Sequence, residues 1–98
     1  MGYQGWKNYE TWCVKLWIDN EEGNYRYWRE QTQEAGKDGA STLAMQLHTE
    51  IEDAAPSLDG MWADLMSAAL SEVDWYEIAE AMIGDEEWED EDEAEAGA

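Results

Sequence analysis

Beyond residue 37, this 98-residue chain contains no lysine and no arginine. Its five basic residues are Lys7, Lys15, Arg26, Arg29 and Lys37, whereas 19 of its 25 acidic residues follow residue 37, and the formal net charge is −20. A surface of one sign repels polyanions and attracts positively charged surfaces over a long range. The missing cations therefore argue against nucleic acid as a direct ligand and predict a basic protein as the partner.

Cysteine and histidine each occur once, as Cys13 and His48. A lone cysteine cannot form an internal disulfide, and one histidine cannot support a Ser, His and Asp arrangement without arbitrary choices. We expect Cys13 to be a buried, inert thiol and His48 to pack or cap beside the third helix. A calcium-loop pattern from Asp19 to Glu30 fails, because Gly23 is at its fifth position and the loop requires glycine at the sixth. We therefore expect a protein that is not an enzyme and that binds no cofactor or metal.

Long apolar runs are missing as well. No run approaches the roughly 18 to 20 residues that a membrane-spanning helix needs. The first residues also lack the charged and apolar regions of a signal peptide. These absences predict a cytoplasmic protein without a membrane contact.

Strand signals are absent too, since no segment alternates apolar and polar residues in the way that a half-buried strand does. Apolar residues recur instead at helical spacing. With no phenylalanine, the core must take much of its volume from seven tryptophans and five methionines, and six of the tryptophans are expected to be structural. The predicted fold is all-α, a small bundle of about five helices over residues 1–84. An acidic tail, residues 85–98, is expected to be flexible when the protein is free.

Capping and breaking residues predict where each helix begins and ends. Asn8 can cap the first helix, and Asp74 can start the fifth with Glu77 as its capping-box partner. A break at Asp19-Asn20 and Gly23-Asn24 is expected between the first and second helices. The expected helices run over about 9–19, about 25–36, 41 or 42 to about 55, 61–73 and 74–84. The residues expected to face inward are Tyr9, Trp12, Cys13, Leu16 and Trp17 in the first helix, Tyr25, Trp28 and Thr32 in the second, Leu43, Leu47, Ile51 and Ala54 in the third, Met61, Trp62, Leu65, Met66, Ala69, Leu70 and Val73 in the fourth, and Trp75, Ile78, Ala79, Met82 and Ile83 in the fifth.

The last fourteen residues, 85–98, contain nine acids. Along a helix these acids would place about one charge per 2.3 Å, compared with one per about 1.7 Å of duplex DNA axis. This similarity predicts that acids of the tail and of the last two helices imitate DNA towards a basic partner. Trp88 either folds back onto the bundle or anchors the partner. The residues expected to contact the partner are Asp64, Glu72, Asp74, Glu77, Glu80, Asp85, Glu86, Glu87, Trp88, Glu89, Asp90, Glu91, Asp92, Glu93 and Glu95.

Two tryptophan-rich segments are distinctive: WKNYETW at 6–12, continuing through LWIDN at 16–20, and LSEVDWYEIAE at 70–80. They resemble a family of small, acidic, mostly uncharacterised proteins carried by phages, plasmids and related mobile elements. The resemblance implies no catalytic residues. It implies a context in which inhibitors of host defence are common, among them DNA-mimicking antirestriction proteins and anti-CRISPR proteins.

The function expected from the sequence is that of a DNA-mimicking inhibitor of a host defence system, either anti-CRISPR or antirestriction, in the host cytoplasm. It would occupy a basic nucleic-acid-binding site, and a homodimer would double its negative surface. The alternative is a non-enzymatic adaptor or regulator that binds a partner protein through an apolar groove. In that case the acidity would serve solubility or adaptation to high salt.

Overall fold

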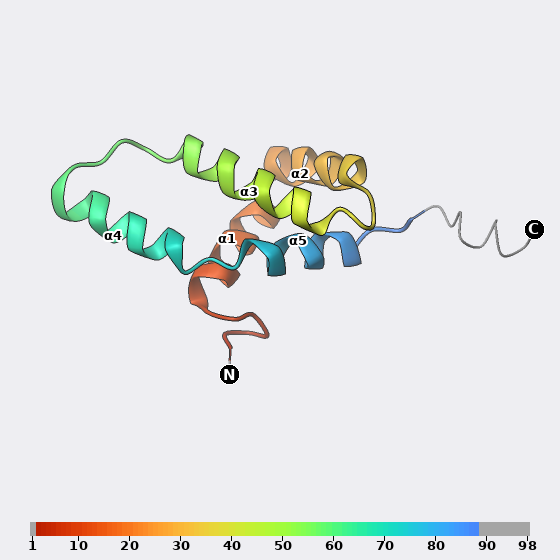
Figure 1. The fold of residues 1–98 in the computed structure, drawn as a ribbon, viewed down its shortest axis with the longest axis horizontal. Coiled ribbons are helices and arrows are strands. Elements are labelled where there is room, and N and C mark those ends of the chain that lie inside the picture. Colours follow the sequence, from red (N-terminus) through yellow and green to blue (C-terminus); the bar gives the residue numbers. More distant parts are fainter. Residues whose placement is uncertain (1, 89–98) are drawn as a thin grey trace, which may run out of the picture.

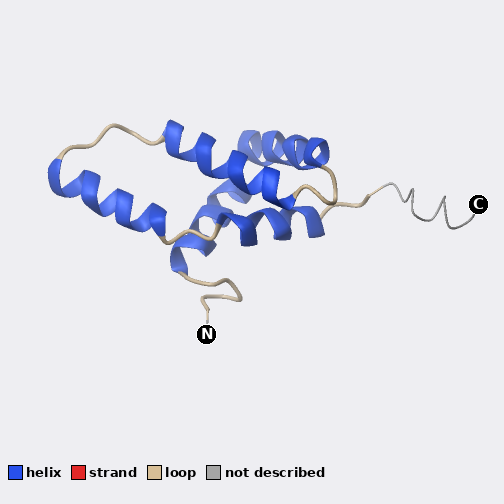
Figure 2. Cartoon of the chain, in the orientation of Figure 1, coloured by secondary structure: helices blue, strands red, loops and turns tan. Residues whose placement is uncertain are grey.

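The computed structural model describes residues 2–88 of the chain; Met1 and residues 89–98, which include most of the predicted tail, lie outside this range. Five helices follow one another along the chain (Figure 1). They are α1 Tyr9–Asn20, α2 Glu22–Ala35, α3 Ala40–Ala54, α4 Gly60–Ser71 and α5 Trp75–Gly84. Residues 2–88 form no strand, only an isolated bridge between Tyr3 and Trp6 (Figure 2). The predicted all-α fold is confirmed.

Two helix starts were predicted from their capping residues. The Asn8 side chain accepts a hydrogen bond of 2.9 Å from the Thr11 backbone N–H and caps α1. The Asp74 side chain likewise accepts from the Glu77 N–H at 3.0 Å and caps α5. Each bond satisfies one of the backbone donors that a helix start leaves without an intrahelical partner.

The second helix begins earlier than predicted. The expected break at Gly23 and Asn24 is wrong, because both residues lie in the first turn of α2. Only Glu21, with φ −98° and ψ 117°, interrupts the helical path between α1 and α2. The amides of a first turn have no intrahelical partner in any helix, so glycine weakens a helix less there than in its interior.

The core lies where α3 and α5 pack together, with α1 and α2 covering them. Leu43 and Leu47 of α3 and Ile78 and Ala79 of α5 are fully buried. The complete buried cluster consists of Ile18, Trp28, Leu43, Leu47, Val73, Trp75, Ile78, Ala79 and Met82. The inward faces predicted for α3 and α5 therefore hold, except that Ala54 at the end of α3 is exposed and Ile51 and Ile83 are half-buried.

The inward face predicted for α1 is wrong. The buried residues of this helix are Thr11, Lys15 and Ile18, and Trp17 is 61% exposed. Polar contacts explain this orientation: the Thr11 hydroxyl accepts from the Asp74 backbone N–H at 2.9 Å. None of the residues predicted to face inward is buried, namely Tyr9, Trp12, Cys13, Leu16 and Trp17.

Part of that predicted face packs against the N-terminal segment instead. The Tyr3 ring makes edge contacts with Tyr9 and Trp12, at centroid distances of 5.2 and 4.9 Å. The bridge between Tyr3 and Trp6 holds this segment in a tight turn. These rings form a small aromatic cluster on the outer side of α1, separate from the main core.

The prediction that α4 faces the core is also wrong, because no residue of α4 is buried. The helix lies at one end of the molecule, joined to α3 by an extended loop, residues 55–59 (Figure 1). α3 ends ahead of Pro56, which pushes Ala55 into an extended conformation, and the chain is led away from the bundle. Val73, which was assigned to this helix, lies beyond its end and is buried.

The prediction that six tryptophans are structural is wrong for the same reasons. Only Trp28 and Trp75 belong to the buried core. Trp17 and Trp62 are more than 60% exposed. The three half-buried tryptophans are Trp6, Trp12 and Trp88.

Candidate interaction surfaces

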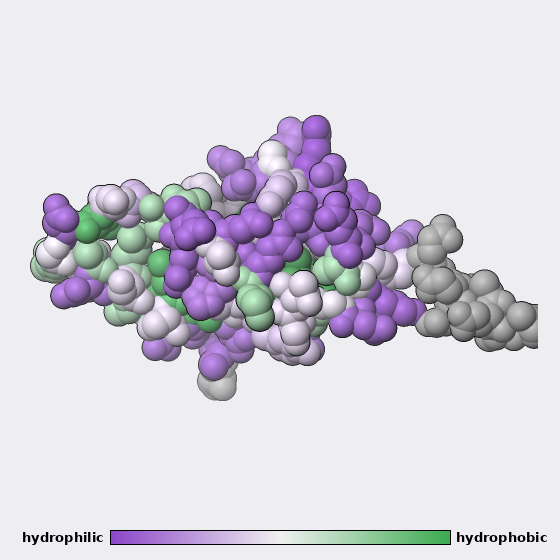
Figure 3. Space-filling view, turned by 45° about the horizontal axis from the view of Figure 1, so that its top comes forward, coloured by the Kyte–Doolittle hydropathy of each residue, from purple (hydrophilic) through white to green (hydrophobic). Residues whose placement is uncertain are grey.

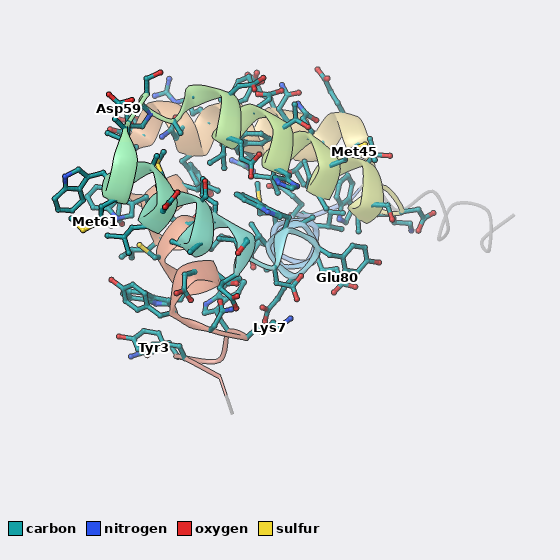
Figure 4. The ribbon with its side chains drawn as sticks, turned by 60° about the vertical axis from the view of Figure 1, so that its left-hand side comes forward. Tyr3, Lys7, Met45, Asp59, Met61 and Glu80 are labelled. Carbon is teal, nitrogen blue, oxygen red and sulfur yellow. The ribbon has the colours of Figure 1, made fainter. Side chains whose placement is uncertain are left out.

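Five of the acids predicted to bind a partner are exposed: Asp64 on α4, Glu72 just after it, Glu80 on α5, and Asp85 and Glu87 beyond α5. Glu80 points outward from α5 (Figure 4). These carboxylates are therefore accessible to a partner, although they come from different parts of the molecule. The predicted contacts Glu89, Asp90, Glu91, Asp92, Glu93 and Glu95 lie outside the described residues.

Four of the predicted acids, including the exposed Asp85, have partners within the molecule. Asp74 and Glu77 accept backbone N–H groups, the first from Glu77 and the second from Lys7 at 3.0 Å. Asp85 lies 3.9 Å from the Lys15 ammonium group. Glu86 pairs with Arg29 at 3.3 Å and accepts a hydrogen bond from Gln33, and its side chain is only 8% exposed. Asp74, Glu77 and Glu86 link parts of the bundle through these contacts, and of these roles only the capping of α5 by Asp74 was predicted from the sequence.

Trp88 was given two alternatives, and the structure has the first of them. Its indole N–H donates a hydrogen bond of 3.0 Å to the Ile83 carbonyl oxygen, and the ring is half-buried. This contact is close to the end of α5, where backbone carbonyls lack intrahelical partners. Together with Asp85 and Glu86, it fastens the residues after α5 to the bundle.

The basic side chains are also engaged with acids. Lys15 is 8% exposed, and its ammonium group lies 2.7 Å from Asp19. Arg26 pairs with Glu22 at 2.7 Å one turn away on α2, whereas Arg29 pairs with Glu86 beyond α5.

The two tryptophan-rich segments meet where α1 and α5 begin. Thr11 donates its hydroxyl to the Asn8 side chain at 2.6 Å and accepts from the Asp74 backbone N–H. The Asn8 amide nitrogen donates to the Glu72 carbonyl oxygen at 2.7 Å. Lys7 bonds to Glu77 through its backbone. We call this network of Lys7, Asn8, Thr11, Asp74 and Glu77 the α1–α5 junction; it is a structural network, because each of its polar groups bonds to another part of the chain.

An apolar groove of about 510 Å³ opens between α4 and the bundle. α4 contributes Met66 and Leu70 to its wall, and α3 contributes Ile51 and Ala54. Its opposite wall comes from α1 and α2, with Cys13, Val14, Trp17, Ile18, Asn24, Tyr27 and Trp28. A groove with this lining can accept an apolar side chain or helix face.

Glu50 is the one acid in the lining of the groove. Its carboxylate accepts a hydrogen bond of 2.6 Å from the Tyr27 hydroxyl, and this bond raises the pKa of the Tyr27 phenol. Gln46 donates a second bond to Glu50 at 3.0 Å. The charge of Glu50 is therefore already engaged by neighbours on α2 and α3.

Cys13 and His48 have packing environments. Cys13 lines the groove and is half-buried, so the prediction of a buried thiol is wrong in degree. The pKa of the neighbouring Tyr9 phenol is raised, mainly by its electrostatic interaction with Cys13. His48 stacks on Trp75 with ring centroids 5.1 Å apart, and its Nε2 atom lies 2.9 Å from Glu52. The packing role predicted for His48 agrees with this position.

A comparison with known protein families matches residues 1–94 to DUF7249, described as a family of unknown function. The chain belongs to DUF7249. No curated protein and no solved structure matches it. Both tryptophan-rich segments of this DUF7249 protein, and the α1–α5 junction that they form, lie within the matched residues.

The alternative function predicted from the sequence includes an apolar groove, but sequence reasoning placed it nowhere and missed the exposure of α4 in this DUF7249 protein. One signal was available: Asp64 is the only charged residue in the twelve residues of α4. A surface helix that packs one face on a core normally carries charged residues on the other. The scarcity of charge in this segment indicated that α4 is not an ordinary surface helix packed on the core. It did not indicate where in the fold the helix lies.

Within residues 2–88 of this DUF7249 protein, no group of three or more His, Cys, Asp or Glu side chains is placed to hold a metal ion. No helix in that range is both long enough and apolar enough to cross a membrane.

Proposed function

We propose that this DUF7249 protein is a non-enzymatic inhibitor that occupies the basic nucleic-acid-binding site of a host defence complex by imitating the charge of DNA. One observation carries the proposal. α3, α4 and α5 contain no lysine or arginine, and the chain as a whole carries a net charge of −20. A partner groove lined with lysine and arginine would attract this part of the molecule by the electrostatics that it uses for phosphates.

The engagement of the basic residues supports the proposal. Lys7, Lys15, Arg26 and Arg29 each lie within 4.0 Å of a carboxylate of the same chain. Each of these cations is paired with an acid of the same chain. They therefore do little to offset the negative charge of the exposed acids of α3 to α5. An approaching cationic surface would meet a field of one sign.

Contacts within the chain divide the proposed partner-binding acids into two groups. Asp64, Glu72, Glu80 and Glu87 are exposed and are proposed to face the partner, together with the acids of residues 89–95. Asp74, Glu77, Asp85 and Glu86 have internal partners, so we assign them a supporting role.

Capture of the host target at increasing salt tests this proposal. The tagged protein is incubated with host lysate, and retention of the captured complex is measured from about 50 mM to about 500 mM NaCl, a range over which the Debye length falls severalfold. Binding driven by charge is expected to weaken about tenfold or more. The expected target is a nucleic-acid-binding complex.

A matched pair of variants makes the test specific to the proposed face. The first combines Asp64→Asn, Glu72→Gln, Glu80→Gln and Glu87→Gln, and is expected to weaken capture about tenfold. The control removes the same number of exposed charges elsewhere, with Glu21→Gln, Glu30→Gln, Glu34→Gln and Asp38→Asn. Equal losses for both variants would mean that only net charge matters and would refute the proposed contact residues.

The apolar groove favours a second candidate function, an adaptor that docks an apolar segment of a partner. The groove has a volume of about 510 Å³ and exposed Trp17 on its wall. Apolar docking does not weaken as salt screens charges. Retention of a partner without any nucleic-acid-binding role at high salt would therefore favour the adaptor over the DNA mimic.

A further inference from the structure

The outer surface of α4 carries a group of large apolar residues that the described fold leaves uncovered. Met61, Trp62 and Leu65 are 61%, 62% and 55% exposed. Hydrophobic residues gather at the end of the molecule that α4 occupies (Figure 3). Met61 projects from the first turn of α4, away from the rest of the bundle (Figure 4). Adjacent exposed apolar residues of this kind mark interaction sites.

Helical spacing makes this surface continuous with the groove. Met61, Leu65 and Ala69 follow one row along α4, and Trp62, Met66 and Leu70 follow the neighbouring row. Met66 and Leu70 line the groove, while the first row lies on the outer side. We call these six residues the α4 face.

Charge identifies the occupant of this face. Each of the other four helices contains at least two acids, whereas Asp64 is the only charged residue of α4. At 100° per residue, Asp64 lies about 150° around the helix from the centre of the α4 face. Two molecules of charge −20 can therefore approach each other with least repulsion through α4.

A cationic peptide fits the α4 face less well. Such a ligand needs carboxylates beside the apolar surface. Two acids line the pockets that Met66 and Leu70 border, and both have partners: Glu50 is bonded to Tyr27 and Gln46, and Glu52 lies 2.9 Å from His48. A second copy needs no such charges and presents the same apolar residues in return, as two-fold symmetric contacts do.

We propose that α4 is a self-association surface through which two copies of this protein pair about a two-fold axis. The α4 face of each copy packs against that of the other, and Trp62 of each copy is covered. Asp64 stays on the far side of each helix, so the paired molecule keeps the exposed acids of both copies. Pairing does not depend on the proposed inhibition of a host complex.

Sedimentation equilibrium of the full-length purified protein, of mass 11.2 kDa per chain, tests the pairing. A dimer is expected, and its association is expected to tighten severalfold as NaCl rises from about 50 mM to about 500 mM, because salt screens the repulsion between the two copies. This dependence is opposite to that of binding to a basic target. A mass of one chain at every salt concentration, or a dimer that dissociates as salt rises, would overturn the proposal.

Two exposed substitutions locate the contact. Trp62→Gln with Leu65→Gln is expected to give a monomer with unchanged helical circular dichroism, since neither residue is buried. The control, Met45→Gln with Tyr76→Gln, removes exposed apolar residues of α3 and α5 and should leave the dimer intact. A dimer that survives the α4 substitutions would refute α4 as the contact.

A cross-link provides a second, independent reading. In a Cys13→Ala background, Leu65→Cys near the middle of α4 is expected to form an intermolecular disulfide under mild oxidation, because equivalent residues lie close together near a two-fold axis. Met45→Cys should not form this disulfide, and cross-linking of Met45→Cys as efficient as that of Leu65→Cys would contradict the assignment.

The outcomes for pairing and for inhibition can be told apart. If the variant with Trp62→Gln and Leu65→Gln is a monomer that still captures a basic target, pairing is supported separately from inhibition. If the dimer forms and no basic target is captured, only the proposed inhibition fails.

Discussion

Thr11 shows how much a single polar residue contributes to this fold. It is fully buried, and its hydroxyl accepts from the Asp74 N–H while donating to the Asn8 side chain. A buried backbone donor that loses its acceptor costs more than the net value of the hydrogen bond, because its desolvation is no longer offset. The α1–α5 junction therefore depends on this hydroxyl.

Replacing Thr11 by valine tests the junction, since the shape of the side chain is nearly kept and the hydroxyl is lost. We expect Thr11→Val to lower the free energy of unfolding by about 1 to 3 kcal/mol. Urea denaturation followed by circular dichroism measures the change. Thr49→Val, at an exposed position of α3, is the control; equal stability of the two variants would show that the buried bond contributes little.

Tyr27 gives a prediction about alkaline pH. Its hydrogen bond to Glu50 raises the pKa of the phenol above 10.0 in the folded protein. A group whose pKa is raised by folding stabilises the fold fully below its unfolded pKa, and this contribution is lost as pH rises through the folded value. We expect Tyr27→Phe to reduce the loss of unfolding free energy between about pH 9 and pH 11. Urea denaturation across this range measures it, with Tyr25→Phe on the same helix as the control; identical alkaline behaviour of Tyr27→Phe and the unmodified protein would contradict the assignment.

The helices differ in how far the sequence predicts them. The starts of α1 and α5 were predictable because Asn8 and Asp74 bond to amides three residues away, and local chemistry decides such caps. The buried face of α1 was not predictable in this way. Thr11 bonds to Asp74 and Lys15 approaches Asp85, so partners more than sixty residues away decide which side of α1 faces inward.

α4 was recognisable as a helix but its position was not. Its spacing of Met61, Leu65 and Ala69 is that of a helix that covers a core. The core closes without it, however, because α1, α2, α3 and α5 already bury Leu43, Leu47 and Ile78. Periodicity reveals that a helix has an apolar face and does not reveal what covers that face. The groove, which needs α4 to stand beside α1 and α3, was therefore beyond sequence reasoning.

Hydrogen exchange tests this difference between the helices. In the monomeric Trp62→Gln, Leu65→Gln variant, we expect α4 amides to exchange at least about tenfold faster than those of α3 and α5, since few buried contacts hold α4 in place. Exchange measured by mass spectrometry on the unmodified protein should show slower exchange in α4 as concentration rises. Protection of α4 equal to that of α3 in the monomeric variant would contradict the exposed position of this helix.

At the scale of the whole molecule, the charges of the two sequence halves have different roles. The basic residues all precede Asp38 and, at Lys7, Lys15, Arg26 and Arg29, pair with acids of the same chain. α3, α4 and α5 contain no lysine or arginine, so no cation of these helices can pair with their acids. This arrangement links the fold to the proposed function. The cations stabilise the bundle by pairing with some of the acids, and the remaining exposed acids are available to a partner. The α4 face, nearly without charge, is suited to a different contact.

The central claim is that this protein and DNA compete for one site, and displacement of bound DNA measures it most directly. A labelled duplex is bound to the captured target complex, and the unlabelled protein is added at low salt while release of the duplex is followed by fluorescence anisotropy. The account predicts full displacement by the unmodified protein and about tenfold weaker displacement by the variant carrying Asp64→Asn, Glu72→Gln, Glu80→Gln and Glu87→Gln. A complex that holds the duplex and the protein at the same time would contradict the claim.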